Sequence, residues 1–246
     1  MQFTKMEGLG NDFVVVDGSV QVTPDLVRRL ADRRRGVGAD GVLQVTLEDG
    51  LVRMGYWNAD GSVAEMCGNG LRCVARYAVD RGLVNASTFT IMTPVGERRV
   101  NVADEPRVEI GPTEVGESFE FEGWVLHRVG VGNPHAVAFV QELSTAPVAD
   151  LGSELERLTP GGINVEFVRV VDRHKIEMRV WERGIGETMA CGSGMVAAAA
   201  ASQHLGFTDS VVIVRVPGGE GTVELDGSTS WLTGPVSYTF SGETAG

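Results

Sequence analysis

Two cysteines lie in nearly identical glycine-rich segments that are far apart in the chain. The first segment is Met66-Cys67-Gly68-Asn69-Gly70, and the second is Ala190-Cys191-Gly192-Ser193-Gly194. Each segment precedes a stretch typical of a helix, so each thiol is expected at a helix N-terminus. Unpaired N–H groups and the positive end of the helix dipole favour the thiolate there. Two such thiols predict proton transfer on both faces of one carbon atom.

The positions of other landmarks indicate a twofold internal repeat. Asn11 and Asn133 each follow a glycine and open an apolar run. Asn11 precedes Cys67 by nearly the same number of residues as Asn133 precedes Cys191. A repeat of this length is too long for a solenoid. It predicts two homologous domains facing each other across a cleft, with boundaries at 1–113 and 114–235 and a last strand, about 236–246, that packs back on the first domain.

Each half is expected to be rich in strands and to contain one central helix. A proline at the first helical position and a glycine after the last one mark helix ends. The polar segment from Gly111 to about Glu122 is expected to link the domains. Helices are expected at about 25–35, 69–81, 148–158 and 192–205, and strands at 13–17, 42–47, 52–57, 88–92, 98–102, 124–131, 136–140, 164–171, 175–181, 211–216, 221–225 and 236–240.

The overall composition is that of a globular protein, and it excludes several function classes. The 246 residues are 43% hydrophobic and 22% charged, which is enough for a substantial core. The formal net charge of −12 argues against nucleic-acid binding, which needs a basic surface. No apolar run approaches membrane-spanning length, and no signal peptide is recognisable. Three cysteines do not form a disulfide framework, so a reducing cytoplasm is expected.

Several of these residues also have ordinary structural explanations. Cys73 lies inside the helix on another face from Cys67 and is expected in the core. His135 could be a hydrogen-bonded core histidine, and Glu182 with Arg183 could be a surface ion pair. The run 33–35 is expected to be a solvated helix end. The histidines lack the spacing of metal ligands, and no phosphate-binding or dinucleotide motif occurs, so neither a metal nor a cofactor is expected.

The two cysteine segments resemble the signatures of the diaminopimelate epimerase family. The first runs from Met66 to Cys73, and the second from Glu182 to Gly194. Other blocks that match are 8–13, 38–41, 58–62 and 132–135. The resemblance implies an α/β (α+β) fold of two pseudo-symmetric domains, each a curved, mostly antiparallel sheet wrapped around a central helix. It also implies cofactor-free interconversion of LL- and meso-diaminopimelate, for lysine and peptidoglycan synthesis, by a cytoplasmic homodimer.

The resemblance assigns roles to individual positions. Cys67 and Cys191 are the two bases, and the small-molecule substrate lies between them. Backbone N–H groups at Gly68-Asn69 and Gly192-Ser193 are expected to hold the reacting carboxylate. The remaining residues implied to bind substrate are Asn11 and Gln44 near the reacting end, Asn58, Asn133, Asn164, Glu182 and Arg183 at the distal amino acid centre, and His135 beside them.

Other functions are compatible with parts of this pattern. A related cofactor-independent racemase acting on a different amino acid would share the paired cysteines. A phenazine-pathway isomerase of the same fold lacks the paired cysteines, and a proline racemase lacks the Glu-Arg-Gly block at 182–184. A redox switch would use the thiols without turnover, and a purely structural protein would leave the repeated glycine segments unexplained.

Overall fold

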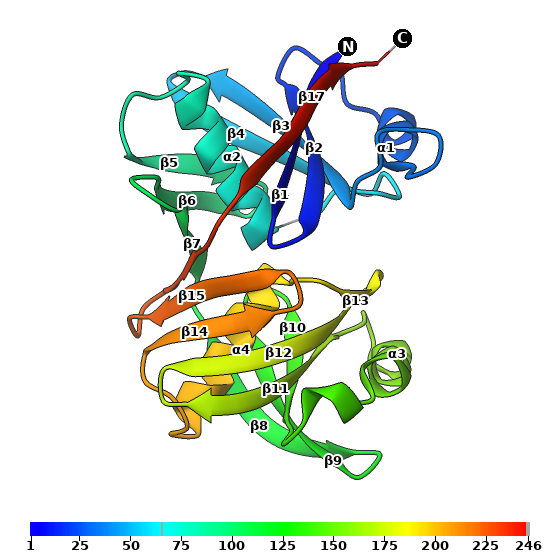
Figure 1. Ribbon diagram of the computed structural model, residues 1–246, viewed down its shortest axis with the longest axis vertical. Coiled ribbons are helices and arrows are strands. Elements are labelled where there is room, and N and C mark those ends of the chain that lie inside the picture. Colours follow the sequence, from blue (N-terminus) through cyan, green and yellow to red (C-terminus); the bar gives the residue numbers. More distant parts are fainter. Residues whose placement is uncertain (65, 245–246) are drawn as a thin grey trace. The chain divides into compact units, whose positions relative to one another are not determined.

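The computed structural model describes residues 1–64 and 66–244, which form two compact units (Figure 1). The first unit consists of Met1–Val108 with Gly234–Gly246, and the second of Glu109–Thr233. Residues 245–246 of the expected last strand lie outside the described residues. Among the helices of the described part of the chain, none is long and apolar enough to cross a membrane.

The first unit is a mostly antiparallel sheet with a helix packed on it. The parallel pairs are β2–β3 and β4–β5, and the other pairs are antiparallel. The central helix contacts the first four strands of the unit. The elements are β1 (Gln2–Gly8), β2 (Asn11–Asp17), α1 (Pro24–Ala31), β3 (Gly41–Glu48), β4 (Leu51–Asn58), α2 (Gly68–Asp80), β5 (Thr88–Thr93), β6 (Gly96–Asn101) and β17 (Ser237–Glu243).

The second unit repeats this plan with a second central helix. Its parallel pairs are β10–β11 and β12–β14. Strand β7 (Arg107–Gly111) begins in the first unit and ends in the second. The other elements are β8 (Glu114–Phe121), β9 (Trp124–Gly130), β10 (Pro134–Phe139), the 3-10 turn η1 (Leu143–Thr145), α3 (Val148–Leu158), β11 (Asn164–Asp172), β12 (Lys175–Glu182), β13 (Gly186–Thr188), α4 (Gly192–His204), β14 (Val211–Val216), β15 (Gly219–Leu225) and β16 (Ser230–Thr233).

The central helix α4 has small side chains that allow strands to pack closely around it. Its Ala197–Ala201 run is buried on all sides, with at most 4% of any residue exposed. Strands β8 to β12 and β14 to β16 contact this helix. Small alanine side chains let the strands approach on every face, as the apolar run predicts. The expected fold class, a mostly antiparallel sheet around a central helix in each half, is confirmed.

Three sequence-based expectations about elements were wrong or incomplete. The polar segment after Gly111 is not an open link, because 114–121 forms β8 and pairs with β9. The polar residues of this strand face solvent, and for that reason the composition of the segment had suggested a loop. The helix expected to reach residue 35 ends at Ala31, since the Asp32 carboxylate accepts the N–H groups of the next turn. Strand β1 was not expected, although it pairs with both β2 and β17.

Candidate active site

Both cysteines cap the central helix of their unit. Cys67 and Cys191 have extended backbones, and helices α2 and α4 begin at the next residue. The N–H of Gly70 donates to Cys67 Sγ at 3.3 Å, and that of Gly194 donates to Cys191 Sγ at 3.4 Å. The expected helix starts are therefore confirmed, and each sulfur accepts a hydrogen bond from the first turn that follows it.

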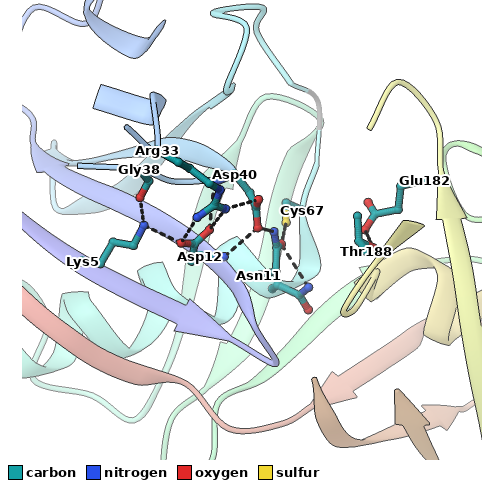
Figure 2. A network of polar contacts seen from close by, with 10 residues as sticks. Lys5, Asn11, Asp12, Arg33, Gly38, Asp40, Cys67, Glu182 and Thr188 are labelled. Carbon is teal, nitrogen blue, oxygen red and sulfur yellow. Dashed lines mark hydrogen bonds and ion pairs between the residues drawn. The ribbon is translucent and has the colours of Figure 1, made fainter. Parts of the chain in front are cut away.

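Asn11 lies beside the first thiol, where Figure 2 shows a connected polar network. Cys67 Sγ donates to Asn11 Oδ1 at 3.5 Å, and Asn69 Nδ2 donates to the same oxygen at 3.2 Å. Asn11 Nδ2 donates to Asp40 Oδ2 at 2.8 Å. Because the Asp40 carboxylate accepts a hydrogen bond from the Asn11 amide nitrogen, it orients the amide so that Asn11 Oδ1 points toward the Cys67 thiol. The structure thus brings together three of the expected site residues, Asn11, Cys67 and Asn69.

Behind Asn11, the network continues through Asp12 (Figure 2). Arg33 makes two hydrogen bonds to the Asp12 carboxylate, at 2.7 and 3.0 Å, and one to Asp40 at 2.7 Å. Lys5 Nζ lies 2.7 Å from Asp12 and also donates to the Gly38 carbonyl. Burial alone would raise the pKa of Asp12, but the hydrogen bonds from Arg33 and Lys5 outweigh it and hold that pKa well below its ordinary value. Arg33 is therefore more than a solvated helix end.

A chain of polar contacts leads from the second thiol into the core. Cys191 Sγ lies 3.5 Å from Ser193 Oγ, which accepts from Asn133 Nδ2 at 3.4 Å. Asn133 Oδ1 lies 2.9 Å from His135 Nε2. The other ring nitrogen, His135 Nδ1, lies 2.6 Å from Glu166 Oε1. The structure therefore joins Cys191, Ser193, Asn133 and His135 and adds Glu166, which the sequence had not singled out.

The environment of Cys191 opposes its ionisation. Burial raises the pKa of the thiol, and the carboxylates of Glu182 and Glu166 raise it further. The hydrogen bonds from Ser193 and the Gly194 N–H lower the pKa but do not offset the burial. The Gly194 N–H at the helix terminus lowers the pKa of Cys191, as expected, but the net shift is upward because desolvation is the larger effect.

The expected distal residues of the second unit are held close to this chain. Asn164 Nδ2 donates to the Pro134 carbonyl at 2.9 Å, and its Oδ1 accepts from the Arg183 N–H at 3.0 Å. Arg183 Nη1 donates to the Gly161 carbonyl at 3.2 Å. Glu182 accepts a hydrogen bond from the Thr188 hydroxyl (Figure 2). The contacts of Asn164 thus connect the start of β10 with the segment that follows β12.

Gln44 and Asn58 make other contacts. Gln44 Nε2 donates to the carbonyls of Val20 at 2.6 Å and Gly18 at 3.4 Å. Asn58 Nδ2 donates to Ser62 Oγ at 3.0 Å, which closes the turn after β4. None of these three hydrogen bonds goes to Cys67 or Asn11. The expected roles of Gln44 and Asn58 in substrate binding stay predictions.

Sequence reasoning missed Asp40, Glu166 and Arg72. Asp40 lies in a glycine-rich segment that was interpreted as a turn, although its match to a family block was a usable signal. Glu166 lies within a strand expected from its apolar pattern, and Arg72 directly precedes a core cysteine. Their burial and partners depend on the tertiary fold. Over residues 1–64 and 66–244, the structure contains no cluster of three side chains arranged to hold a metal ion.

Sequence comparison gives matches over nearly the whole chain. A family model described as "Diaminopimelate epimerase" matches residues 3–115 and 128–239. A protein from Halorhodospira halophila named diaminopimelate epimerase is 42% identical over 275 aligned positions, which cover 99% of this chain and 94% of that protein. One of the same name from Corynebacterium glutamicum is 41% identical and covers 98% of this chain and 97% of its own length.

Structural comparison finds the same fold in more distant proteins. A putative phenazine biosynthesis PhzC/PhzF protein from Clostridium difficile superposes with a TM-score of 0.78 at 14% identity, covering 100% of this chain and 99% of its own. A probable proline racemase from Agrobacterium radiobacter gives a TM-score of 0.77 at 18% identity, covering 99% and 92%. At such low identity, the likeness establishes the fold alone.

Proposed function

The chain belongs to the diaminopimelate epimerase family, and from this membership we propose that Cys67 and Cys191 are the two acid–base groups of its reaction. The protein is an isomerase of the amino acid racemase and epimerase class, and it interconverts LL- and meso-diaminopimelate. This reaction belongs to the synthesis of diaminopimelate and lysine. The product would also supply peptidoglycan synthesis.

The observation that supports the two thiols most directly is their matched position. Each sulfur caps a central helix and accepts an N–H hydrogen bond from the residue at the same place in the following turn. A sulfur held in this way can exchange one proton without moving its backbone. In the proposed reaction, one thiolate removes the α-hydrogen and becomes a thiol. The other thiol delivers its proton to the opposite face and becomes a thiolate.

The carbanion formed between these two steps needs electrostatic stabilisation. The α-hydrogen of an amino acid is a very weak acid, so donors must act on the charge as it develops. We assign this role to the N–H groups of Gly68-Asn69 and Gly192-Ser193, at the N-termini of two helices, where anions bind readily. Asn11, fixed by Asp40, would line the reacting end beside Gln44.

The distal amino acid centre carries both a carboxylate and an ammonium group. Arg183 would bind the carboxylate and Glu182 the ammonium, because charge-assisted hydrogen bonds are the stronger ones. Asn58, Asn133 and Asn164 would add amide contacts, with His135 beside them. In this proposal the protein works in the cytoplasm as a homodimer and uses neither a metal nor pyridoxal phosphate.

The test is isotope exchange at the α-carbon. Reduced protein is incubated with LL-diaminopimelate in deuterated water, and the α-proton is followed by NMR beside Cys67→Ala and Cys191→Ala. Deuterium should enter one α-centre as the meso isomer forms, and both variants should lose at least about a hundredfold in rate. Cys73→Ala is the matched control and should keep the rate, because Cys73 is fully buried in the core.

Two outcomes would contradict the proposal in different ways. Formation of the meso isomer at the parent rate in either active-site variant would show that the two thiols are not the acid–base pair. Folded, reduced protein without exchange on this substrate would instead favour a related racemase that acts on a different amino acid. A panel of other amino acids under the same conditions would identify it.

A further inference from the structure

Arg72 is a buried cation near the beginning of helix α2. Its side chain is 0% exposed, and it is the largest of the fully buried side chains in the described residues. Within residues 1–64 and 66–244, its three guanidinium nitrogens have no hydrogen-bond partner. Burial lowers the pKa of the guanidinium, which means that the fold disfavours its charge. A charge kept in such a place without matched partners is costly, so a function is the better explanation.

Charges on the strands that pack on α2 are already matched with one another. Lys5 on β1 lies 2.7 Å from Asp12 on β2. Arg53 on β4 lies 2.8 Å from Glu48 on β3. Further along the helix, Asp80 accepts from the Tyr238 hydroxyl of β17 at 3.0 Å. These groups therefore have partners other than Arg72.

Within residues 1–64 and 66–244, four groups have a charge that would act on Arg72, namely Cys73, Cys67, Glu105 and Glu7. Burial raises the pKa of Cys73 far above its ordinary value, so this thiol stays neutral. Glu105 is exposed, and water screens its charge. Glu7 is partly exposed and accepts the Gly10 N–H at 2.8 Å. Of these four groups, Cys67 is the one that the proposed reaction uses.

The position of the guanidinium supports this pairing. A Cβ atom built on Gly8 would lie 3.2 Å from Arg72 Nη2 and 3.4 Å from the Asn69 carbonyl. The guanidinium therefore lies between the first turn of α2 and the end of β1. Cys67 directly precedes this turn as the N-cap of α2, and the chain that follows β1 contains Asn11, whose oxygen accepts from the Cys67 thiol. Glycine at position 8 leaves the space that the guanidinium occupies.

We propose that Arg72 is a positioning residue for the epimerisation, and that its buried charge stabilises the thiolate form of Cys67. The thiol form of Cys67 donates to Asn11, and the thiolate form loses that bond when the proton leaves. The guanidinium offsets the negative charge that remains on sulfur. This inference rests on the proposed function, in which Cys67 must ionise to remove the α-hydrogen.

The internal repeat offers a comparison for this assignment. Val196 of helix α4 stands at the same place after Cys191 as Arg72 does after Cys67, and it is also fully buried. The fold therefore accepts an apolar side chain at this place in a central helix. The cation at position 72 is a property of the first unit and is not required by the helix–sheet packing.

The experiment titrates Cys67 without substrate. In the background Cys73→Ala/Cys191→Ala, Cys67 is the single thiol, and it is partly exposed. The rate of its alkylation by iodoacetamide is measured against pH for the parent, Arg72→Met, Arg72→Lys and Arg76→Met. Arg76 is the matched control, because it lies on the same helix and pairs with Asp80 at 3.7 Å.

Arg72→Met should lower the thiolate fraction of Cys67 near neutral pH about tenfold, the effect of removing one nearby charge. Arg72→Lys should recover most of that fraction, and Arg76→Met should leave it unchanged. Thermal unfolding of Arg72→Met should occur at or above the parent temperature, since methionine removes a buried unpaired charge. If Arg72 served in packing alone, the Arg72→Met substitution would not shift the pH dependence of Cys67 alkylation.

An unchanged titration in Arg72→Met would overturn the inference, and so would an equal shift in Arg76→Met. Arg72→Gln replaces the methionine variant if that variant does not fold. Failure of both to fold would also overturn it, because the charge would then be a structural requirement. Failure of the proposed function is a separate result, since it would appear as absent deuterium exchange with diaminopimelate and not in the thiol titration.

Discussion

The two thiols cap equivalent helices, but a basic side chain lies near one and acidic side chains lie near the other. Cys67 shares the first turns of α2 with the buried cation Arg72, whereas Val196 stands at that place in α4. Cys191 is buried near two carboxylates, Glu166 and Glu182, which raise its pKa in addition to the effect of burial. The comparison teaches that one backbone arrangement can place two thiols in different electrostatic surroundings. A two-base mechanism starts from one thiolate and one thiol, and the two sulfurs exchange these forms in each turnover.

A second difference lies in the strands beneath the helices. In the first unit, Phe13 on β2 and Leu43 on β3 are fully buried apolar residues. The parallel registers of the two units place His135 on β10 and Glu166 on β11 at the same positions. A Cβ atom built on Gly70 would meet Leu43 at 3.1 Å, and one built on Gly194 would meet Glu166 at 2.8 Å. The second unit has therefore replaced an apolar pair by a polar one.

We expect the largest change in the free energy of unfolding at a position where the first unit has a charged residue and the second has an uncharged one. Asp12 follows Asn11, whereas Pro134 follows Asn133. We expect Asp12→Asn to lower the free energy of unfolding by about 3 kcal/mol, because it leaves the buried Lys5 without its carboxylate. Urea unfolding measures this loss. Asp25→Asn is the matched control and should change little, since that carboxylate is exposed and its partner Arg28 is half exposed.

The effect of Asp12 should depend on pH in a defined direction. The pKa of Asp12 is lowered on folding, so its stabilisation is fully present above the unfolded value of about 4. It is lost as the pH falls through the folded-state value. The difference between wild type and Asp12→Asn should therefore be constant from about pH 5 to 7 and shrink below about pH 4. A difference that grows on acidification would contradict this account of the network.

The sequence was sufficient for the central helices and both thiol positions, because glycine-rich helix starts and helix-ending glycines are local signals. It was not sufficient for the charges that distinguish the two units. Arg72 and Glu166 lie within segments whose apolar pattern predicts burial, and a charged residue in such a segment looks like an exposed one. Only the packed fold shows that both are fully buried. Likewise, the burial that raises the pKa of Cys191 is not visible from a helix start.

The next effect concerns the polar pair of the second unit. Glu166→Leu leaves His135 Nδ1 buried without the carboxylate that lies 2.6 Å away, and we expect a loss of about 2 kcal/mol in unfolding free energy. Adding His135→Phe recreates the pair found as Phe13 and Leu43, and should recover most of the loss. Chemical unfolding of both single variants and the double variant measures the coupling.

The result decides whether the two pairs are alternative solutions for the same packing. Glu154→Leu is the matched control for the chemical change, because Glu154 lies on α3 with its side chain 46% exposed. Its stability should stay within about 0.5 kcal/mol of wild type. If the losses in unfolding free energy of the two single variants simply add in the double variant, the two pairs correspond in position but cannot replace each other in packing.

The smallest effect concerns the one hydroxyl beside Cys191. Ser193 Oγ accepts from Asn133, which leaves its hydrogen free to point to the sulfur 3.5 Å away. This bond lowers the pKa of Cys191, so Ser193→Ala should raise the pKa and reduce the thiolate fraction about threefold to tenfold. Ser193→Thr keeps the hydroxyl and should titrate as the parent does.

Because Cys191 is only 6% exposed, its ionisation is best followed without a reagent, by the ¹³Cβ chemical shift of labelled cysteine in a Cys67→Ala/Cys73→Ala background. In the first unit, Asn69 stands at the same place after Cys67 as Ser193 does after Cys191, but the Asn69 amide donates to Asn11 at 3.2 Å. A shift in Ser193→Ala that Ser193→Thr does not share would show that the hydroxyl partly offsets the two carboxylates. Equal titrations of all three proteins would mean that the Ser193 hydroxyl does not contribute, and that burial, Glu166 and Glu182 set the protonation of Cys191.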